Sequence, residues 1–157
     1  LKQCREFVCR SPFDYPRQAA LLLPRPPHGD AENPNTAAWR AWAKEQTLDL
    51  VRLSEGRALV LTTSASQCKE LGKHLAERSG YPTAYQGQGM DNGQLVEWFK
   101  RTPNAVLVGT SSFWAGVSVE GEQLSLVVID RIPFDSHEDP FFQARRQWYD
   151  EKGLKSW

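Results

Sequence analysis

Two clusters of hydroxyl side chains stand where they could hold phosphate oxygens, each after a short apolar run. They consist of Thr62, Thr63 and Ser64 after residues 58–61, and of Thr110, Ser111 and Ser112 after residues 105–109. Such hydroxyls, together with the free backbone amides at a helix start, bind phosphate oxygens. If both runs are parallel strands of one sheet, both clusters lie at the same edge. We therefore expect a polar rim suited to a phosphodiester backbone, although Ser64 and its neighbours are also typical helix caps.

The motifs of the common catalytic sites are missing from the sequence. It contains no GxxxxGK[ST] phosphate loop, no HExxH and no GxSxG. The histidines are scattered, and we expect surface or turn positions for His28, His74 and His137. Asp130 ends a predicted strand, a usual place for a catalytic carboxylate, but Arg131 follows it and offers a structural ion pair instead.

The three cysteines do not have the spacing of a metal site. Cys4 and Cys9 lack both the CxxC spacing and the further ligands that a zinc ion or an iron–sulfur cluster needs. Cys68 falls on the apolar face of a predicted helix, where a thiol is a core residue. We therefore expect reduced, structural cysteines and no metal bound by this chain.

The composition indicates a soluble globular domain of 157 residues, of which 40% are hydrophobic and 24% charged. Nineteen basic residues balance nineteen acidic ones, so any contact with nucleic acid has to be local. There is no signal peptide pattern and no apolar run long enough to cross a bilayer, so we expect a cytoplasmic protein with no membrane partner. Because the chain begins at Leu1 and stops at Trp157, just after a predicted helix, we expect a piece of a longer polypeptide; a processed chain would look the same.

The first region, residues 1–56, is predicted to hold one strand and one long helix. The apolar run at residues 18–23 is predicted to be a strand that ends at Pro24, because proline removes a hydrogen-bond donor. Residues 28–35 read as a loop. Residues 36–54 contain no helix breaker and end before Gly56. Their predicted apolar face consists of Trp39, Ala43, Leu50 and Leu53.

From residue 57 onward, strands and helices alternate. Strands are predicted at residues 58–61, 83–86, 105–108 and 124–129. Helices are predicted to begin at Ser64 with Gln67, at Asp91 with Gln94, and at Asp139 before Pro140. They end at Gly80, about residue 101, and Gly153. This alternation predicts an α/β fold, a parallel sheet with right-handed crossovers and helices on both faces.

The stretch VLVGTSSFWAGVSVEGEQLSLVVIDRIPFDSHEDP, residues 106–140, resembles a segment of DinG-type helicases, relatives of the XPD family in superfamily 2. In that family a buried strand leads into a G-[TS]-x-S-F-W-x-G-V-D-x-x-G loop. Residues 129–134 and Asp139-Pro140 match the strand end and helix start that follow. In the loop, the matching residues are Gly109, Thr110, Ser112, Phe113, Trp114, Gly116, Val117 and Gly121. Residues 58–64, 85–87 and 11–24 match more weakly, so the resemblance covers nearly the whole chain.

The resemblance implies a RecA-like domain, here an incomplete second motor domain of an ATP-dependent DNA helicase. Residues 1–56 would be the inter-domain segment and the amino-terminal part of that domain. Residues 57–157 would be the RecA-like helicase C-terminal domain, truncated before the arginine-finger motif. The family's Q-x-x-GR-x-x-R segment, whose arginines would reach the ATP phosphates, is absent from this sequence.

The resemblance also assigns roles to residues. Single-stranded DNA would be gripped by the two hydroxyl clusters, with Phe113 and Trp114 acting as a wedge or buttress. Gln86 stands at the end of the family's second strand and joins this DNA-binding set. Stacking of Trp114 on a base and packing of its ring in the core both stay open. The residues on the nucleotide side would be Gly116, Ser118, Gly121, Asp130 and Arg131.

Other parts of the machinery would lie in the first motor domain, the implied partner of this chain. They include the Walker motifs that bind ATP and Mg²⁺, and the cysteines of an iron–sulfur cluster. Alone, the chain would be inactive and would bind no cofactor. Two loop residues depart from the family, since Ala115 stands for Glu or Gln and Ser118 for Asp. They favour an alternative, a degenerate module that binds single-stranded nucleic acid or a protein partner without motor activity. The resemblance does not separate the housekeeping branch of the family from the CRISPR-associated branch.

Overall fold

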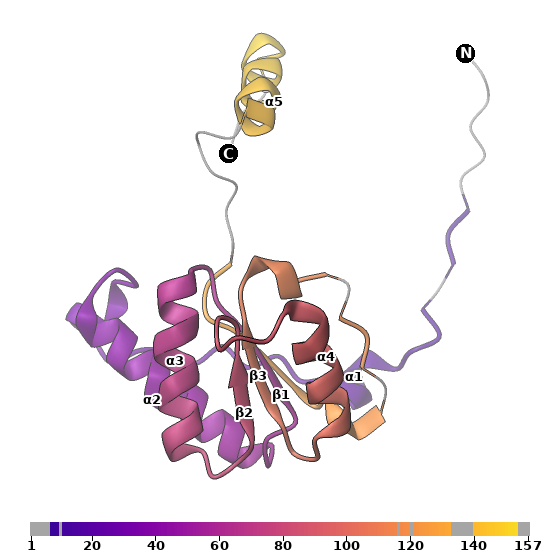
Figure 1. Ribbon diagram of the computed structural model, residues 1–157. Coiled ribbons are helices and arrows are strands. Elements are labelled where there is room, and N and C mark those ends of the chain that lie inside the picture. Colours follow the sequence, from indigo (N-terminus) through magenta and orange to yellow (C-terminus); the bar gives the residue numbers. More distant parts are fainter. Residues whose placement is uncertain (1–6, 10, 116, 120, 133–139, 154–157) are drawn as a thin grey trace.

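A parallel sheet forms the centre of the structure, a computed structural model that describes residues 7–9, 11–115, 117–119, 121–132 and 140–153 (Figure 1). Within these residues the strand order is β2-β3-β1-β4, and neighbouring strands are parallel. The strands are β1 Ala58–Leu61, β2 Thr83–Tyr85, β3 Val106–Gly109 and β4 Leu126–Ile129. The prediction of a parallel α/β fold with strands near these positions is confirmed.

Helices cover both faces of the sheet, as predicted. The α-helices are α1 Tyr15–Gln18, α2 Ala37–Leu53, α3 Ala65–Arg78, α4 Asn92–Arg101 and α5 Pro140–Glu151. Three short 3₁₀ turns occupy Asp30–Glu32, Ser111–Phe113 and Gly121–Gln123. Helices α2 and α3 pack against one face and α4 against the other (Figure 1). None of the described helices is long and apolar enough to cross a membrane.

Two apolar cores result because successive side chains of a strand point to opposite faces of the sheet. In β1, Val60 joins Leu48 and Leu75 in the core under α2 and α3. Its neighbour Leu59 joins Phe99 in the core under α4. All five of these side chains are at most 5% exposed. Because both faces are covered, the strand sequence is apolar throughout rather than alternating.

The helix starts predicted at Ser64 and Asp91 carry the expected caps, whereas Asp139, predicted to cap the helix that begins at Pro140, lies outside the described residues. Thr36 and Ser64 each accept a backbone hydrogen bond three residues on, at the starts of α2 and α3. Asp91 and Gln94 form a reciprocal capping box at α4. Gly56 has φ +75°, and a β-carbon there would collide with the backbone of Asn104, so only glycine fits after α2.

The prediction of a strand at residues 18–23 was wrong. A short helix, α1, ends at Gln18, the first residue of this stretch, and residues 19–27 form no helix or strand. Leu21 and Leu23 are 84% and 78% exposed. The segment lies across a groove from β4, and no hydrogen bond joins the two among the described residues. Apolar residues alone do not make a strand, because a strand also needs a neighbour for its backbone groups.

The buried face of α2 also differs from the prediction. Thr47, Leu48 and Val51 are its buried residues. Leu53 is 79% exposed, and the other three residues of the predicted face are only partly buried. Those three (Trp39, Ala43 and Leu50) line the groove beside β4 instead. The helical period was right, but the sheet lies under a neighbouring stripe of the helix.

The register of the strands determines which residues lie next to one another where the strands end. Leu61 of β1 stands beside Gly109 of β3 and beside Ile129 of β4. The next residues, Thr62, Thr110 and Asp130, therefore leave the sheet side by side at its carboxyl edge.

Candidate nucleic-acid interface

Gln86, directly after β2, organises the loop that follows β3. Its Oε1 accepts hydrogen bonds from the backbone N–H of Thr110 at 3.1 Å and from the Thr110 hydroxyl at 2.7 Å. Its Nε2 lies 3.1 Å from Oγ of Ser112 and 3.1 Å from Oδ1 of Asn92. One amide side chain thus holds both ends of the second hydroxyl cluster and ties it to the start of α4.

The loop after β3 also rests on the core through Phe113. The ring is 2% exposed, and a β-carbon added to Gly109 would come closer than 3.0 Å to it. Glycine at position 109 therefore lets the ring close under the strand end. Ser111 and Ser112, in the turn above the ring, are exposed to solvent. Phe113 thus anchors the loop in the core, while Ser111 and Ser112 remain exposed to solvent.

The first hydroxyl cluster divides into one buried and two accessible residues. Thr62 is fully buried, and its Oγ1 lies 3.3 Å from the carbonyl oxygens of Gly109 and Ser64. Its backbone N–H also donates to Gly109 at 2.9 Å. Thr62 therefore joins the end of β1 to the end of β3 and does not reach the surface. Thr63 is exposed, and Ser64 is half-buried as the cap of α3.

Trp114 lies at the border between loop and core. Its ring is partly buried and packs beside the core under α4. The indole Nε1 is buried and has no hydrogen-bond partner among the described residues. Since part of the ring is already covered, core packing accounts for at least part of its role.

The residues predicted on the nucleotide side lie in two places. Ser118 lines a hollow with Lys100, Val119 and Gln123, and Gly121 opens the 3₁₀ turn nearby with φ +74°. Asp130 and Arg131 instead follow β4. Gly116 lies outside the described residues.

Arg131 contacts the first turn of α2 and the residues just before that helix. Its guanidinium lies over the ring of Trp39, 4.6 Å from the centroid. It also donates to the carbonyl of Pro34 at 2.6 Å and to Oδ1 of Asn35 at 3.4 Å. Nε is 3.9 Å from Oδ2 of Asp130, too far for a hydrogen bond. Burial raises the pKa of Asp130, which the charge of Arg131 only partly offsets.

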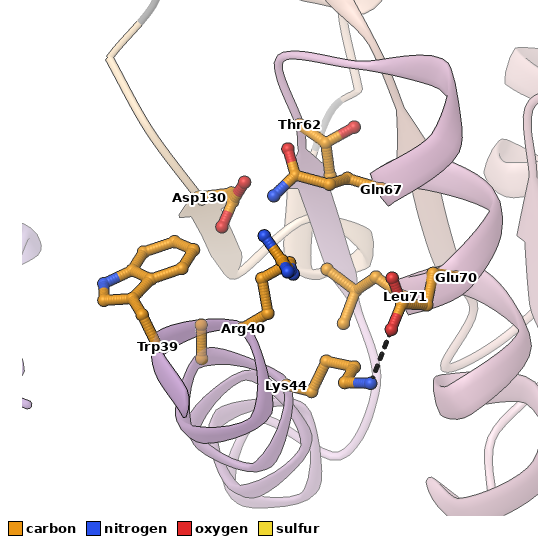
Figure 2. A pocket seen from close by; sticks show the side chains of 9 residues that line it. Trp39, Arg40, Lys44, Thr62, Gln67, Glu70, Leu71 and Asp130 are labelled. Atoms are coloured by element: carbon orange, nitrogen blue, oxygen red, sulfur yellow. Dashed lines mark hydrogen bonds and ion pairs between the residues drawn. The ribbon is translucent and has the colours of Figure 1, made fainter. Parts of the chain in front are cut away.

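Beside these residues lies a pocket that sequence reasoning missed (Figure 2). Helices α2 and α3 form its walls, and the ends of β1 and β4 form its inner side. Its polar lining includes Arg40, Lys44, Gln67 and Glu70. A helix that precedes a parallel strand begins at the carboxyl edge of the sheet, and this rule could have placed Arg40 near the hydroxyl clusters. Asn92, which orients Gln86, was missed as well. Among the described residues, no three His, Cys, Asp or Glu side chains gather to hold a metal ion.

The parallel sheet and the residues at its carboxyl edge define a RecA-like α/β domain. Hydroxyl and amide side chains follow three of its strands and form what is called here the hydroxyl row: residues 62–64, Gln86 and residues 110–112. A family model described as the helicase C-terminal domain matches residues 47–157, and the chain belongs to this family. The DinG-type resemblance of the sequence is confirmed by relatives that carry this name.

Three curated relatives illustrate the similarity. The ATP-dependent DNA helicase YoaA of Haemophilus influenzae is 36% identical over 147 residues, 92% of this chain and 22% of that protein. The ATP-dependent helicase DinG of Mycobacterium tuberculosis is 33% identical over 87% of this chain and 20% of its own length. The 3′-5′ exonuclease DinG of Bacillus subtilis is 30% identical over 95% of this chain and 16% of its own length. The chain thus spans about a fifth of these relatives or less. No solved structure matches.

Proposed function

We propose that this chain is part of the second motor domain of a DinG-like, ATP-dependent DNA helicase. Residues 1–56 serve as the inter-domain segment and the beginning of that domain, and residues 57–157 form its RecA-like body. The names of the YoaA and DinG helicases support this assignment. ATP is then the substrate of the whole protein, bound between this domain and a first motor domain.

The carboxyl edge of the sheet is proposed to bind the backbone of single-stranded DNA. The observation that carries this proposal is the Gln86 side chain, which holds Thr110 and Ser112 beside the cluster at the end of β1. Thr63, Ser64, Ser111 and Ser112 present hydroxyls, while Thr62, Phe113 and Trp114 support them from below. Hydrogen bonds to phosphate and sugar position a strand without reading its sequence, as translocation requires.

The test is a double substitution, Thr110→Ala with Ser112→Ala, in the whole protein. We expect weaker binding to an oligothymidylate, measured by fluorescence anisotropy at several salt concentrations. Ser125→Ala is the matched control, because this exposed serine precedes β4 at the opposite edge of the sheet. Equal affinities of the double variant and the wild type at every salt concentration would refute the proposed interface.

Catalysis is proposed to require the first motor domain. The sequence has no phosphate loop, so the chain alone should not hydrolyse ATP. Clear turnover in an ATPase assay on the purified chain would overturn this statement. Among the described residues, an exposed Cys9 and a buried Cys68 do not fit an iron–sulfur cluster. Any such cluster, and the Mg²⁺ that accompanies ATP, belongs to the first motor domain in this proposal.

A second candidate function is a binding module without motor activity. It is favoured by Ala115 and Ser118, which replace the acidic or amide residues of the family loop. An ATPase assay on the whole protein separates the two functions. Hydrolysis stimulated by single-stranded DNA supports the motor, whereas DNA binding without hydrolysis supports the module.

A further inference from the structure

The pocket between α2 and α3 lies at the same edge of the sheet as the proposed DNA interface. Asp130, which follows β4, lines its inner side, and the fully buried Thr62, which follows β1, adjoins it without reaching solvent. Figure 2 shows Arg40 reaching from α2 toward the side chains of Gln67 and Asp130. The pocket therefore continues the hydroxyl row along the carboxyl edge of the sheet, from the end of β1 to the end of the neighbouring strand β4.

The positively charged side chains around this pocket differ in how many partners within the protein they already have. Lys44 donates to Oε1 of Glu70 at 2.7 Å, and this ion pair lowers the pKa of Glu70. Arg131 is held by the start of α2, as described above. Arg40 donates only to the carbonyl of Asn35, at 3.2 Å, and no described carboxylate lies within 4.0 Å of its guanidinium. Its remaining N–H groups are therefore available to a ligand.

Gln67 supplies a second donor to the same pocket. Its Oε1 accepts a hydrogen bond from the Ser64 hydroxyl at 3.3 Å, and this bond connects the pocket to the first hydroxyl cluster. Its Nε2 has no protein partner among the described residues and points into the pocket (Figure 2). A guanidinium and an amide that converge in this way suit an oxyanion, because arginine binds phosphate oxygens through parallel N–H donors.

The hydroxyl row needs such a charge if it is to bind DNA. Hydroxyl and amide groups position a backbone, but affinity for phosphate comes largely from lysine and arginine, which release counterions from the nucleic acid. We propose that Arg40 and Gln67 form a subsite for one phosphodiester of single-stranded DNA. The subsite rests on the proposed function, because it continues the same DNA path.

Asp130 opposes the bound phosphate in this subsite. Its side chain is 9% exposed, and its Oδ2 accepts no hydrogen bond among the described residues. A carboxylate on the inner wall repels an anion and so limits affinity, which suits a motor that must release each phosphate as it steps. An occupant that donated hydrogen bonds would instead be attracted by Asp130. The sign of the effect of Asp130→Asn therefore distinguishes an anionic ligand from one that donates hydrogen bonds.

The experiment measures binding of an oligothymidylate to the whole protein between about 50 and 200 mM salt, the range in which phosphate contacts dominate. Arg40→Ala should weaken binding about tenfold at the lowest salt, as expected for a lost charged hydrogen bond. It should also reduce the slope of log K against log salt by about 0.7, the value for one phosphate on a single strand. Arg40→Lys should restore the slope. Arg52→Ala is the matched control, since Arg52 lies at the other end of α2 and binds the carbonyl of Arg78.

Several outcomes would overturn the subsite. They are an unchanged slope for Arg40→Ala, an equal loss for Arg52→Ala, and weaker rather than tighter DNA binding by Asp130→Asn. A free nucleotide is the other source of phosphate. The affinity for ATP should be unchanged in Arg40→Ala, and a loss confined to ATP would also refute the proposal. Circular dichroism and thermal unfolding establish that each variant is folded.

Failure of the subsite can be told apart from failure of the proposed function. If Thr110→Ala with Ser112→Ala weakens DNA binding but Arg40→Ala leaves the slope unchanged, only the subsite is wrong. If the wild type itself does not bind the oligothymidylate, the proposed function and the subsite are both wrong.

Discussion

The hydroxyl of Thr110, after β3, donates to Oε1 of Gln86, after β2, over 2.7 Å. The same amide lies 3.1 Å from the hydroxyl of Ser112 through Nε2, so the acceptor and donor ends of one side chain fix two residues of one loop. Gln86 itself is held by Asn92 at the start of α4. The geometry of the loop therefore depends on a residue that lies 24 positions away in the sequence.

Gln86→Ala should weaken binding to single-stranded DNA about as much as the double substitution in the β3 loop. The reason is that the loop loses its fixed geometry while its hydroxyls remain. Adding Thr110→Ala to this variant should cost little more, because residues that act as one unit are not additive. Anisotropy titrations of both single variants and the double variant give the coupling directly. Additive losses would show that the two residues act independently.

Gly109→Ala should destabilise the domain by about 1–3 kcal/mol, the range for overpacking a core. The new β-carbon would collide with the Phe113 ring, which is closed in below the strand end and has little room to move. Urea unfolding measures the free energy of unfolding. Gly93→Ala is the control, since Gly93 lies in the first turn of α4 and its β-carbon would meet only a side-chain oxygen, at 3.3 Å. The control should change stability by less than about 1 kcal/mol. Equal stability of Gly109→Ala and the wild type would contradict the close approach.

Asp130→Asn should increase the free energy of unfolding at neutral pH. Burial raises the pKa of Asp130 in the folded state, so the folded protein binds this proton more tightly than the unfolded chain does. The contribution of Asp130 to stability therefore falls as the pH rises from about 4 through the raised pKa, and it stays low above that value.

The amide that replaces the carboxyl group in this variant does not titrate, so the advantage over the wild type should grow across the same pH window. Chemical unfolding of both proteins between about pH 4 and pH 7 measures this difference. Comparing the two proteins cancels the opposite pH dependence of Glu70, whose pKa is lowered by its hydrogen bond to Lys44. A constant difference across the window would contradict the prediction.

Cys68 should react with thiol reagents far more slowly than Cys9 at pH 8. Burial raises the pKa of the Cys68 thiol, and the side chain is fully buried, so both thiolate formation and access are restricted. Cys9 is exposed. Iodoacetamide labelling followed by peptide mass spectrometry distinguishes the two positions. Labelling in urea is the control, because the two thiols should then react at similar rates. Equal rates in the native protein would contradict the burial of Cys68.

The elements from residue 57 onward could be predicted because their signals are local. Short apolar runs gave strands, and Asp91 with Gln94 gave a helix start, since a capping box is formed within four residues. The stretch at residues 18–23 could not be predicted in the same way. Its apolar residues resemble a strand, but a strand forms only where another strand supplies hydrogen-bond partners, and that neighbour is not a property of the segment itself.

The sequence by itself determined the family, the alternation of strands and helices, and the two hydroxyl clusters as candidates for phosphate binding. Tertiary structure decided which of these side chains reach solvent. Thr62 and Ser112 look alike in sequence, yet packing between β1 and β3 buries the first and leaves the second exposed. Tertiary structure also decided that Arg40 lies at the carboxyl edge of the sheet, beside the hydroxyl clusters. Both outcomes depend on strand register and on where α2 crosses the sheet, which arise from contacts between residues distant in the chain.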